Sequence, residues 1–289
     1  MSGIGHFTNA QAQASYLSLY DATIAAIPGS PTVHDIPTTF GQVRVYRFGS
    51  ATGTPYVLLH GRGATTAMWE PNLAGLAASR TVYALDSLGE PGRSIQTLPI
   101  RTSADQAAWL TEVLDALGID RAHFAGVSGG GWLVFNQALH TPNRVATAAL
   151  IEPAHVLARF SPKFLLGGLS LLPFLPDSLG DRFLAWVSGN PDMTLPISQL
   201  LTTGMHTYRM ALPMPEYGND TLLRSLRMPV LALLGGRTVP HNPHEAARRA
   251  QMLIPNNETE IWPEATHALS GEFPDQLNAR LLKFAEQAA

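Results

Sequence analysis

The chain has 289 residues, a formal net charge of −3 and no cysteine. Hydrophobic residues make up 45% and charged residues 14%, so a large core can be buried and global disorder is not expected. The lack of cysteine excludes a disulfide scaffold, thiolate metal sites and a cysteine nucleophile, and without a basic run nothing suggests nucleic-acid binding. The length fits one core with a sizeable insertion.

The N-terminal residues do not predict a signal peptide, and the most apolar segment does not predict a membrane span. Met1–Ala10 lacks the positive charge followed by an apolar stretch that marks a signal peptide. The most apolar segment, Phe164–Pro176, is too short to span a bilayer and contains Gly and Pro. We expect a cytoplasmic protein without a membrane span. The oligomeric state cannot be read from the sequence.

The N-terminal part of the chain predicts one helix and two short strands. The helix covers about Asn9 to Ile27 and ends at Pro28-Gly29. Strands are expected at Asp35–Thr39 and Gln42–Phe48, the second with alternating apolar residues.

From Tyr56 onward, continuous apolar strands alternate with helices. Strands are expected at Tyr56–Leu59, Thr81–Leu85, His123–Val127 and Val145–Ile151, with helices at Thr66–Ser79, Ser103–Leu117 and Gly129–His140. After a break, strands at Val230–Leu234 and Glu258–Trp262 alternate with helices near Pro243–Leu253 and at Pro274–Glu286. This alternation is typical of a parallel sheet that is covered by helices on both faces.

The alternation stops at Pro153 and resumes near residue 224. The sequence therefore predicts an α/β fold with a mostly parallel, eight-stranded sheet. Residues 1–152 and 224–289 would form the core. Residues 153–223, rich in Leu, Pro, Gly and Met, would form a helical lid inserted after the sixth strand.

Gly126-Val127-Ser128-Gly129-Gly130 is a G-x-S-x-G sequence between an expected strand and an expected helix. In such a nucleophile elbow the serine occupies a tight, strained turn that exposes its hydroxyl at the carboxyl edge of the sheet. Flanking glycines let the strand and helix approach closely. The alternative is an ordinary turn in which Ser128 only caps the helix.

Ten histidines are present, and His206, His241 and His244 compete with His267 for a role in proton transfer. His267 alone follows the last strand and precedes the final helix. Nucleophile first and base last is the chain order of hydrolases that carry this elbow, which favours His267 as general base.

Together these motifs resemble the α/β-hydrolase superfamily, and within it the small bacterial carboxylesterases, from about residue 40 to 285. The shared motifs are Leu58-Leu59-His60-Gly61, Met68-Trp69, Leu85-Asp86 with Gly89 to Ser94, the elbow, Leu233-Leu234-Gly235, and Thr266-His267 with Phe273-Pro274. The resemblance implies Ser128 as nucleophile and His267 as base. It also implies an oxyanion hole formed by the backbone N–H groups of Arg62 and Gly129. Asp86 would be structural.

The family usually places its third triad member after the seventh strand, where this chain has Thr238 in Gly235-Gly236-Arg237-Thr238. Threonine cannot be an anion, and loss of the acid can lower the rate on the order of 10⁴-fold. Glu152 ends the sixth strand at the same sheet edge, and some haloalkane dehalogenases carry their acid there. We therefore expect a Ser128–His267–Glu152 triad.

Two alternatives to the Glu152 assignment stay open. In the first, Glu152 caps the lid or pairs with an arginine. In the second, the triad acid is another carboxylate, for which the sequence offers weaker candidates. Those candidates are Glu245, Asp220 and Glu264.

The resemblance implies ester hydrolysis through an acyl-enzyme, without a metal or organic cofactor. The apolar side chains of the expected lid suggest that the small-molecule ester has an apolar group. These residues are Phe164-Leu165-Leu166, Leu169 to Leu175, Trp186, Met205, Met210 and Met214. A thioesterase or cyclase, a lactonase and a proline-specific peptidase stay open. So does a non-catalytic binding module, which Thr238 favours and Glu152 opposes.

Overall fold

The computed structural model describes residues 3–172, 175–189, 192 and 194–287. The expectations for Met1–Ala10 and for the apolar run Leu169 to Leu175 therefore fall partly outside the described residues. Among the described residues, no helix is both long and apolar enough to cross a membrane.

One large sheet forms the centre of the molecule, and within the described residues it has nine strands rather than the expected eight. Its order is β11-β10-β8-β7-β4-β5-β3-β2, with β6 beside β3. The strands are β2 (Thr32–Thr38), β3 (Gly41–Phe48), β4 (Tyr56–Leu59), β5 (Val82–Leu85), β6 (Ile95–Gln96), β7 (Ala122–Val127), β8 (Val145–Ile151), β10 (Val230–Gly235) and β11 (Asn257–Trp262). The ninth strand, β6, has two residues, too few to give a periodic pattern.

Along the sheet, β11, β10, β8, β7, β4 and β5 pair in parallel, whereas β3 pairs antiparallel with β5, β2 and β6. All residues of β4 are buried, and alternate residues face opposite sides of the sheet. Val57 and Leu59 belong to the hydrophobic cluster on one face, while Tyr56 and Leu58 belong to the cluster on the other. A continuous apolar run is therefore what this doubly covered strand requires.

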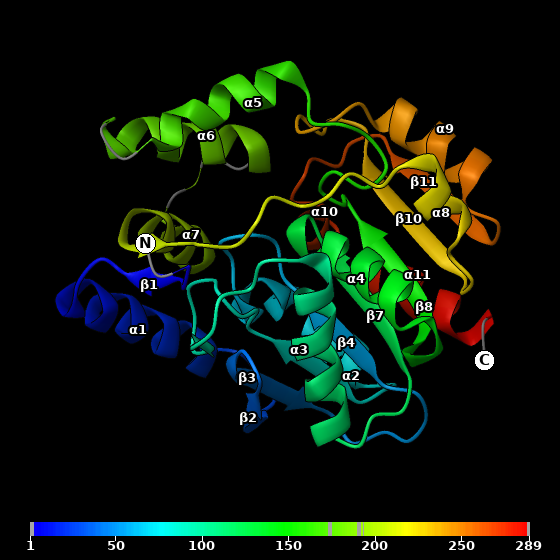
Figure 1. Ribbon diagram of the computed structural model, residues 1–289, viewed down its shortest axis with the longest axis horizontal. Helices are drawn as coiled ribbons and strands as arrows, with labels where there is room; N and C mark the ends of the chain where they lie inside the picture. Colours follow the sequence, from blue (N-terminus) through cyan, green and yellow to red (C-terminus); the bar gives the residue numbers. More distant parts are fainter. Residues whose placement is uncertain (1–2, 173–174, 190–191, 193, 288–289) are drawn as a thin grey trace.

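Helices cover both faces of the sheet, as Figure 1 shows. One face holds α3 (Ser103–Ala116), α4 (Gly129–His140) and α9 (Pro243–Leu253), whose buried residues share one cluster. The other face holds α2 (Glu70–Ala77) and α11 (Pro274–Gln287), with the short α10 (Leu269–Glu272) at its edge.

The helix expected at Thr66–Ser79 is two elements. A 3₁₀ turn, η1 (Thr66–Trp69), precedes α2, and Pro71 lies in the first turn of α2. Proline lacks the N–H that a helix interior needs but is tolerated in the first turn. Residues 66 to 77 are therefore helical, as expected, with a change from 3₁₀ to α geometry just before the proline.

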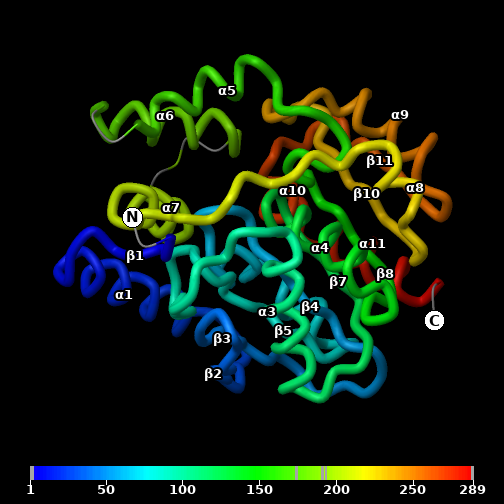
Figure 2. The backbone as a smooth tube through the Cα atoms, viewed as in Figure 1, coloured from blue at the N-terminus to red at the C-terminus, as the bar shows by residue number. Residues whose placement is uncertain are grey.

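The segment between β8 and β10 carries α5 (Pro162–Gly168), η3 (Leu169–Leu171), α6 (Asp177–Ser188), α7 (Pro196–Thr207), β9 (Tyr208–Arg209) and α8 (Asp220–Arg224). We call residues 153–223 the insertion. In the tube view of Figure 2, α5 and α6 stand away from the sheet, and α7 lies beside the N-terminal helix. The role of the insertion as a lid stays a prediction.

The N-terminal segment is joined to the insertion, an arrangement that the sequence did not predict. The helix α1 (Ala10–Ala25), which Asn9 caps, packs against α7. The strand β1 (His6–Phe7) pairs with β9 in an antiparallel two-residue ladder. These contacts tie α7 and β9 of the insertion to the N-terminal segment.

Candidate active site

Ser128 lies at the turn between β7 and α4. Its backbone has φ 53° and ψ −113°, a conformation that non-glycine residues rarely adopt. Its N–H donates to the carbonyl of Ile151 at 3.0 Å, and its carbonyl accepts from the N–H of Ala154 at 3.0 Å. The neighbouring strand end therefore holds the strained turn on both sides.

Glycine is required around this turn because backbones meet there. A Cβ atom on Gly130 would lie 2.2 Å from the carbonyl oxygen of Leu59 and 2.5 Å from that of His60. A Cβ on Gly126 would lie 2.2 Å from the oxygen of Gly130. The glycines of the motif therefore let β4, β7 and α4 come together at Ser128.

The loop after β4 is held by hydrogen bonds on both sides of Arg62. The N–H of Gly61 donates to the Sδ of Met68 at 3.1 Å, and the N–H of Gly63 donates to Oε2 of Glu90 at 2.5 Å. A Cβ atom on Gly129 would lie 3.2 Å from the backbone nitrogen of Arg62. The loop that carries Arg62 therefore lies directly against the elbow.

His60 supports this loop through both ring nitrogens. Its Nδ1 lies 2.8 Å from the carbonyl oxygen of Gly61, and its Nε2 lies 2.9 Å from the N–H of Ser87. One nitrogen donates and the other accepts, as a neutral imidazole does. With both nitrogens occupied and the residue 1% exposed, His60 is placed to support the loop rather than to transfer protons.

Glu152 directly follows β8 and is completely buried. Its backbone φ is 48°, so it shares with Ser128 the left-handed region that favours glycine. Its N–H donates to the carbonyl of Leu233 at 2.9 Å, and its Oε1 accepts from the N–H of Gly235 at 2.6 Å. Both partners belong to β10, which fixes the carboxylate at the sheet edge.

The other oxygen of Glu152 contacts His267, on the loop after β11. His267 Nδ1 lies 2.8 Å from Glu152 Oε2. A carboxylate only accepts, so Nδ1 carries the proton and Nε2 is left as the basic nitrogen. Among the described residues no hydrogen bond joins the Ser128 hydroxyl to His267; such bonds are often long without substrate and tighten when it binds.

Thr238 occupies the family's usual place for the acid. Its hydroxyl donates to Oε2 of Glu152. The residue at that place therefore supplies a hydrogen bond to the carboxylate, which comes from the neighbouring strand. The sequence showed that Thr238 is not an anion but gave no sign that it contacts Glu152.

A second imidazole also reaches the carboxylate. Nε2 of His241 lies 3.5 Å from Oε2 of Glu152, and both side chains are buried. Burial would raise the pKa of Glu152, but interactions with His241 and His267 lower it to about 2. The carboxylate is therefore ionised at neutral pH, as an orienting partner for His267 must be.

The weaker acid candidates lie elsewhere. Asp220 pairs with Arg249 at 2.9 Å, and Glu264 faces Arg237 at 3.9 Å on the surface. Glu245 is exposed in the first turn of α9.

Asp86 also has its expected structural partners. Its carboxylate accepts from the hydroxyl of Tyr20 at 2.6 Å and from the N–H groups of Thr66 and Arg93 at 3.0 and 2.9 Å. Asp86 thus joins α1 to the core. Arg93 also forms an ion pair with Asp21.

The insertion contacts the loops that carry these residues. The guanidinium of Arg62 donates to the carbonyl of Pro213 at 3.2 Å. Thr266, next to His267, donates through its hydroxyl to the carbonyl of Ser188 at 2.7 Å.

Arg62 and Gly129 also line a cavity of about 10 Å³ beside the elbow.

No group of three or more histidine, aspartate or glutamate side chains that could hold a metal occurs among the described residues.

Comparisons with known proteins agree with this architecture. The alpha/beta hydrolase family matches residues 56–280. A Bacillus subtilis (strain 168) protein, uncharacterized carboxylesterase nap, is 34% identical over 278 residues, which are 93% of this chain and 91% of that protein. Carboxylesterase YbfK of the same strain is 30% identical over 281 residues, which are 93% of each chain.

Solved structures are similar over nearly the whole chain. The crystal structure of naproxen esterase (carboxylesterase NP) from Bacillus subtilis has a TM-score of 0.89 and 32% identity, and covers 96% of this chain and 99% of its own. That of carboxylesterase CesB from the same organism has a TM-score of 0.88 and 28% identity, and covers 95% and 98%. The chain belongs to the alpha/beta hydrolase family. The resemblance to small bacterial carboxylesterases is confirmed.

The low pKa of Glu152 predicts a pH-dependent contribution to stability. The folded-state pKa of about 2 lies below the ordinary value of 4.5, so ionisation of Glu152 stabilises the fold above about pH 4.5. This contribution, up to about 3 kcal/mol, is lost as the pH falls from 4.5 towards 2. Urea unfolding of the parent and Glu152→Gln over this range measures it. If the difference between the two free energies of unfolding stayed constant over this range, the low pKa of Glu152 would be contradicted.

Proposed function

We propose that the chain is a carboxylic ester hydrolase that works through a Ser128–His267–Glu152 triad. The observation that carries the proposal is the 2.8 Å hydrogen bond between His267 and the buried carboxylate of Glu152. It supplies the acid that the usual position, Thr238, cannot. The names of the relatives, carboxylesterase and naproxen esterase, support the same reaction.

In the proposed mechanism the hydroxyl of Ser128 attacks the ester carbonyl while Nε2 of His267 takes its proton. Glu152 stabilises the resulting imidazolium of His267 and holds the proton on its Nδ1 by a hydrogen bond. The protonated His267 then gives Nε2–H to the leaving alcohol. In the second half, water attacks the acyl-enzyme with His267 again as base, and Ser128 is released.

The oxyanion would be held by two backbone donors. The N–H of Gly129 is in the first turn of α4, where N–H groups lack a partner within the helix and the dipole favours negative charge. The N–H of Arg62 lies across from it on the loop after β4. Two such donors, preorganised for the charge of the transition state, contribute strongly to acyl transfer.

We propose an apolar group on the substrate because of the aromatic side chains of the insertion. Phe160, Phe164, Phe183 and Trp186 form a row with successive ring centroids 5.0, 5.5 and 6.1 Å apart. Leu166, on α5, is 70% exposed. Thioester and lactone substrates fit the same chemistry. The cytoplasmic location stays a prediction.

Changing the acid without changing its shape tests the triad. Glu152→Gln should lower kcat on p-nitrophenyl esters at least about 100-fold, because the amide cannot stabilise the imidazolium of His267. Glu264→Gln, at an exposed surface pair, is the matched control and should keep the parental rate. Circular dichroism establishes that each variant is folded. A folded Glu152→Gln protein with kcat within a few-fold of the parent would refute Glu152 as the acid.

Labelling by a fluorophosphonate separates an enzyme from a binding module. The reagent should modify Ser128 in the parent and leave Ser128→Ala unmodified. If folded parent protein stayed unlabelled at Ser128, the non-catalytic alternative would hold.

Glu90 provides a test of the oxyanion loop. Glu90→Ala removes the acceptor for the N–H of Gly63, so the neighbouring N–H of Arg62 should lose its fixed position. We expect kcat to fall about 10-fold or more with little change in KM, since the interaction acts in the transition state. Glu90→Gln keeps an acceptor oxygen and should restore most of the rate. Equal losses in both variants would show that Glu90 does not act through this hydrogen bond.

A further inference from the structure

His241 is a buried histidine that the proposed mechanism does not use. It lies in the loop between β10 and α9, and its side chain is 2% exposed. Within the described part of the chain, neither of its ring nitrogens has a hydrogen-bond partner. Leaving such a polar group buried costs free energy, so its placement calls for a physical reason.

The group that His241 faces is the carboxylate of Glu152. Its Nε2 lies 3.5 Å from Oε2, the same oxygen that accepts from His267 Nδ1 and from the hydroxyl of Thr238. An oxygen with two lone pairs and two donors has no third acceptor site. His241 therefore lies beside this carboxylate oxygen after both of its acceptor positions are taken.

The loop holds His241 in this position. The carbonyl groups of Val239 and Pro240 accept from the hydroxyl and the N–H of Ser161 at 2.8 and 2.7 Å. His241 is thus tethered to the start of α5, while Glu152 is anchored to β10.

Two titratable groups of the site lie on the side of this imidazole that faces the sheet edge. Glu152 faces it from the end of β8, and His267 shares the same carboxylate oxygen from the loop after β11. The charged residues on these two loops, Arg237 and Glu264, pair with each other at the surface with exposed side chains. His244 follows on the exposed first turn of α9.

We propose that His241 is a positioning residue of this site. When His241 is protonated, its positive charge offsets part of the negative charge of Glu152, so a proton on His267 is stabilised less. His267 therefore stays a free base at lower pH. The inference rests on the proposed triad. Two imidazoles that share one buried carboxylate titrate as a coupled pair, because a proton on either one weakens the stabilisation of a proton on the other. His241 would therefore extend activity towards acid pH.

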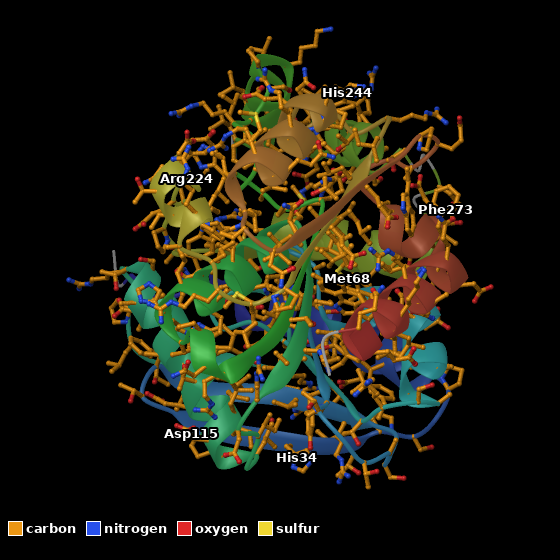
Figure 3. All side chains as sticks on the ribbon, turned by 90° about the vertical axis from the view of Figure 1, so that its right-hand side faces the viewer. His34, Met68, Asp115, Arg224, His244 and Phe273 are labelled. Atoms are coloured by element: carbon orange, nitrogen blue, oxygen red, sulfur yellow. The ribbon has the colours of Figure 1, made fainter. Side chains whose placement is uncertain are left out.

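The pH profile of kcat/KM tests this role. In His241→Asn the competing charge is gone, so His267 should protonate more readily and the acidic limb should move up by about half a pH unit or more. His244→Asn is the matched control, because it removes an exposed histidine from α9, at the periphery in Figure 3, and should leave the limb unmoved. An acidic limb that stays in place or moves down in His241→Asn would overturn the proposal.

Two further measurements keep the test decisive. Fluorophosphonate labelling of Ser128 in the parent shows whether the triad works at all: labelled protein with an unmoved limb refutes only His241, whereas unlabelled protein refutes the triad. If His241→Asn does not fold, ¹⁵N NMR of the parent replaces it. The ring nitrogens of His241 should titrate together with those of His267, and nitrogen shifts that stay constant between about pH 4 and 9 would overturn the proposal.

Discussion

The hydrogen bond between Glu152 and His267 is the interaction on which the rest of the site depends. It joins the end of β8 to the loop after β11, two places 115 residues apart in the chain. A fully buried carboxylate is stable only if its charge is compensated, and here β10 supplies a backbone N–H, Thr238 a hydroxyl, and His267 and His241 their imidazoles. The energetic demand of one buried charge thus brings three loops together at one sheet edge.

Backbone strain occurs at the same place. Ser128 and Glu152 both have positive φ although neither is glycine, and their turns follow adjacent parallel strands. Each donates a backbone hydrogen bond to the neighbouring strand end: the N–H of Ser128 to the carbonyl of Ile151, and the N–H of Glu152 to the carbonyl of Leu233. Such conformations persist where the surrounding structure determines them, and they are concentrated at functional sites. The core of the fold therefore stabilises the two turns that present the proposed nucleophile and the proposed acid.

Much of the fold followed from sequence patterns with a direct physical cause. The continuous apolar strands predicted a doubly covered parallel sheet, and the G-x-S-x-G turn placed Ser128 between β7 and α4. Glu152 was proposed as the acid from its position after a buried strand, because parallel strands end at one edge. The stretch expected as helical over Thr66–Ser79 is helical as far as Ala77, but its division into η1 and α2 beside Pro71 was not predicted.

The remainder depends on contacts that no local pattern encodes. The hydroxyl of Thr238 and the imidazole of His241 meet Glu152 only because β8 and β10 are neighbours and the loop after β10 folds back over the strand end. The two-residue strands β1, β6 and β9 are too short for periodicity, and the packing of α1 on α7 joins helices that are far apart in the chain, Ala10–Ala25 and Pro196–Thr207.

The central claim is that Ser128, His267 and Glu152 form one catalytic unit with the N–H groups of Arg62 and Gly129. A crystal structure of the protein after reaction with a fluorophosphonate measures this most directly. The account predicts phosphorus bonded to Oγ of Ser128 and a phosphoryl oxygen within hydrogen-bond distance of both N–H groups. It also predicts that His267 stays bound to Glu152. A phosphoryl oxygen turned away from those two N–H groups, or a His267 bound to another carboxylate, would contradict it.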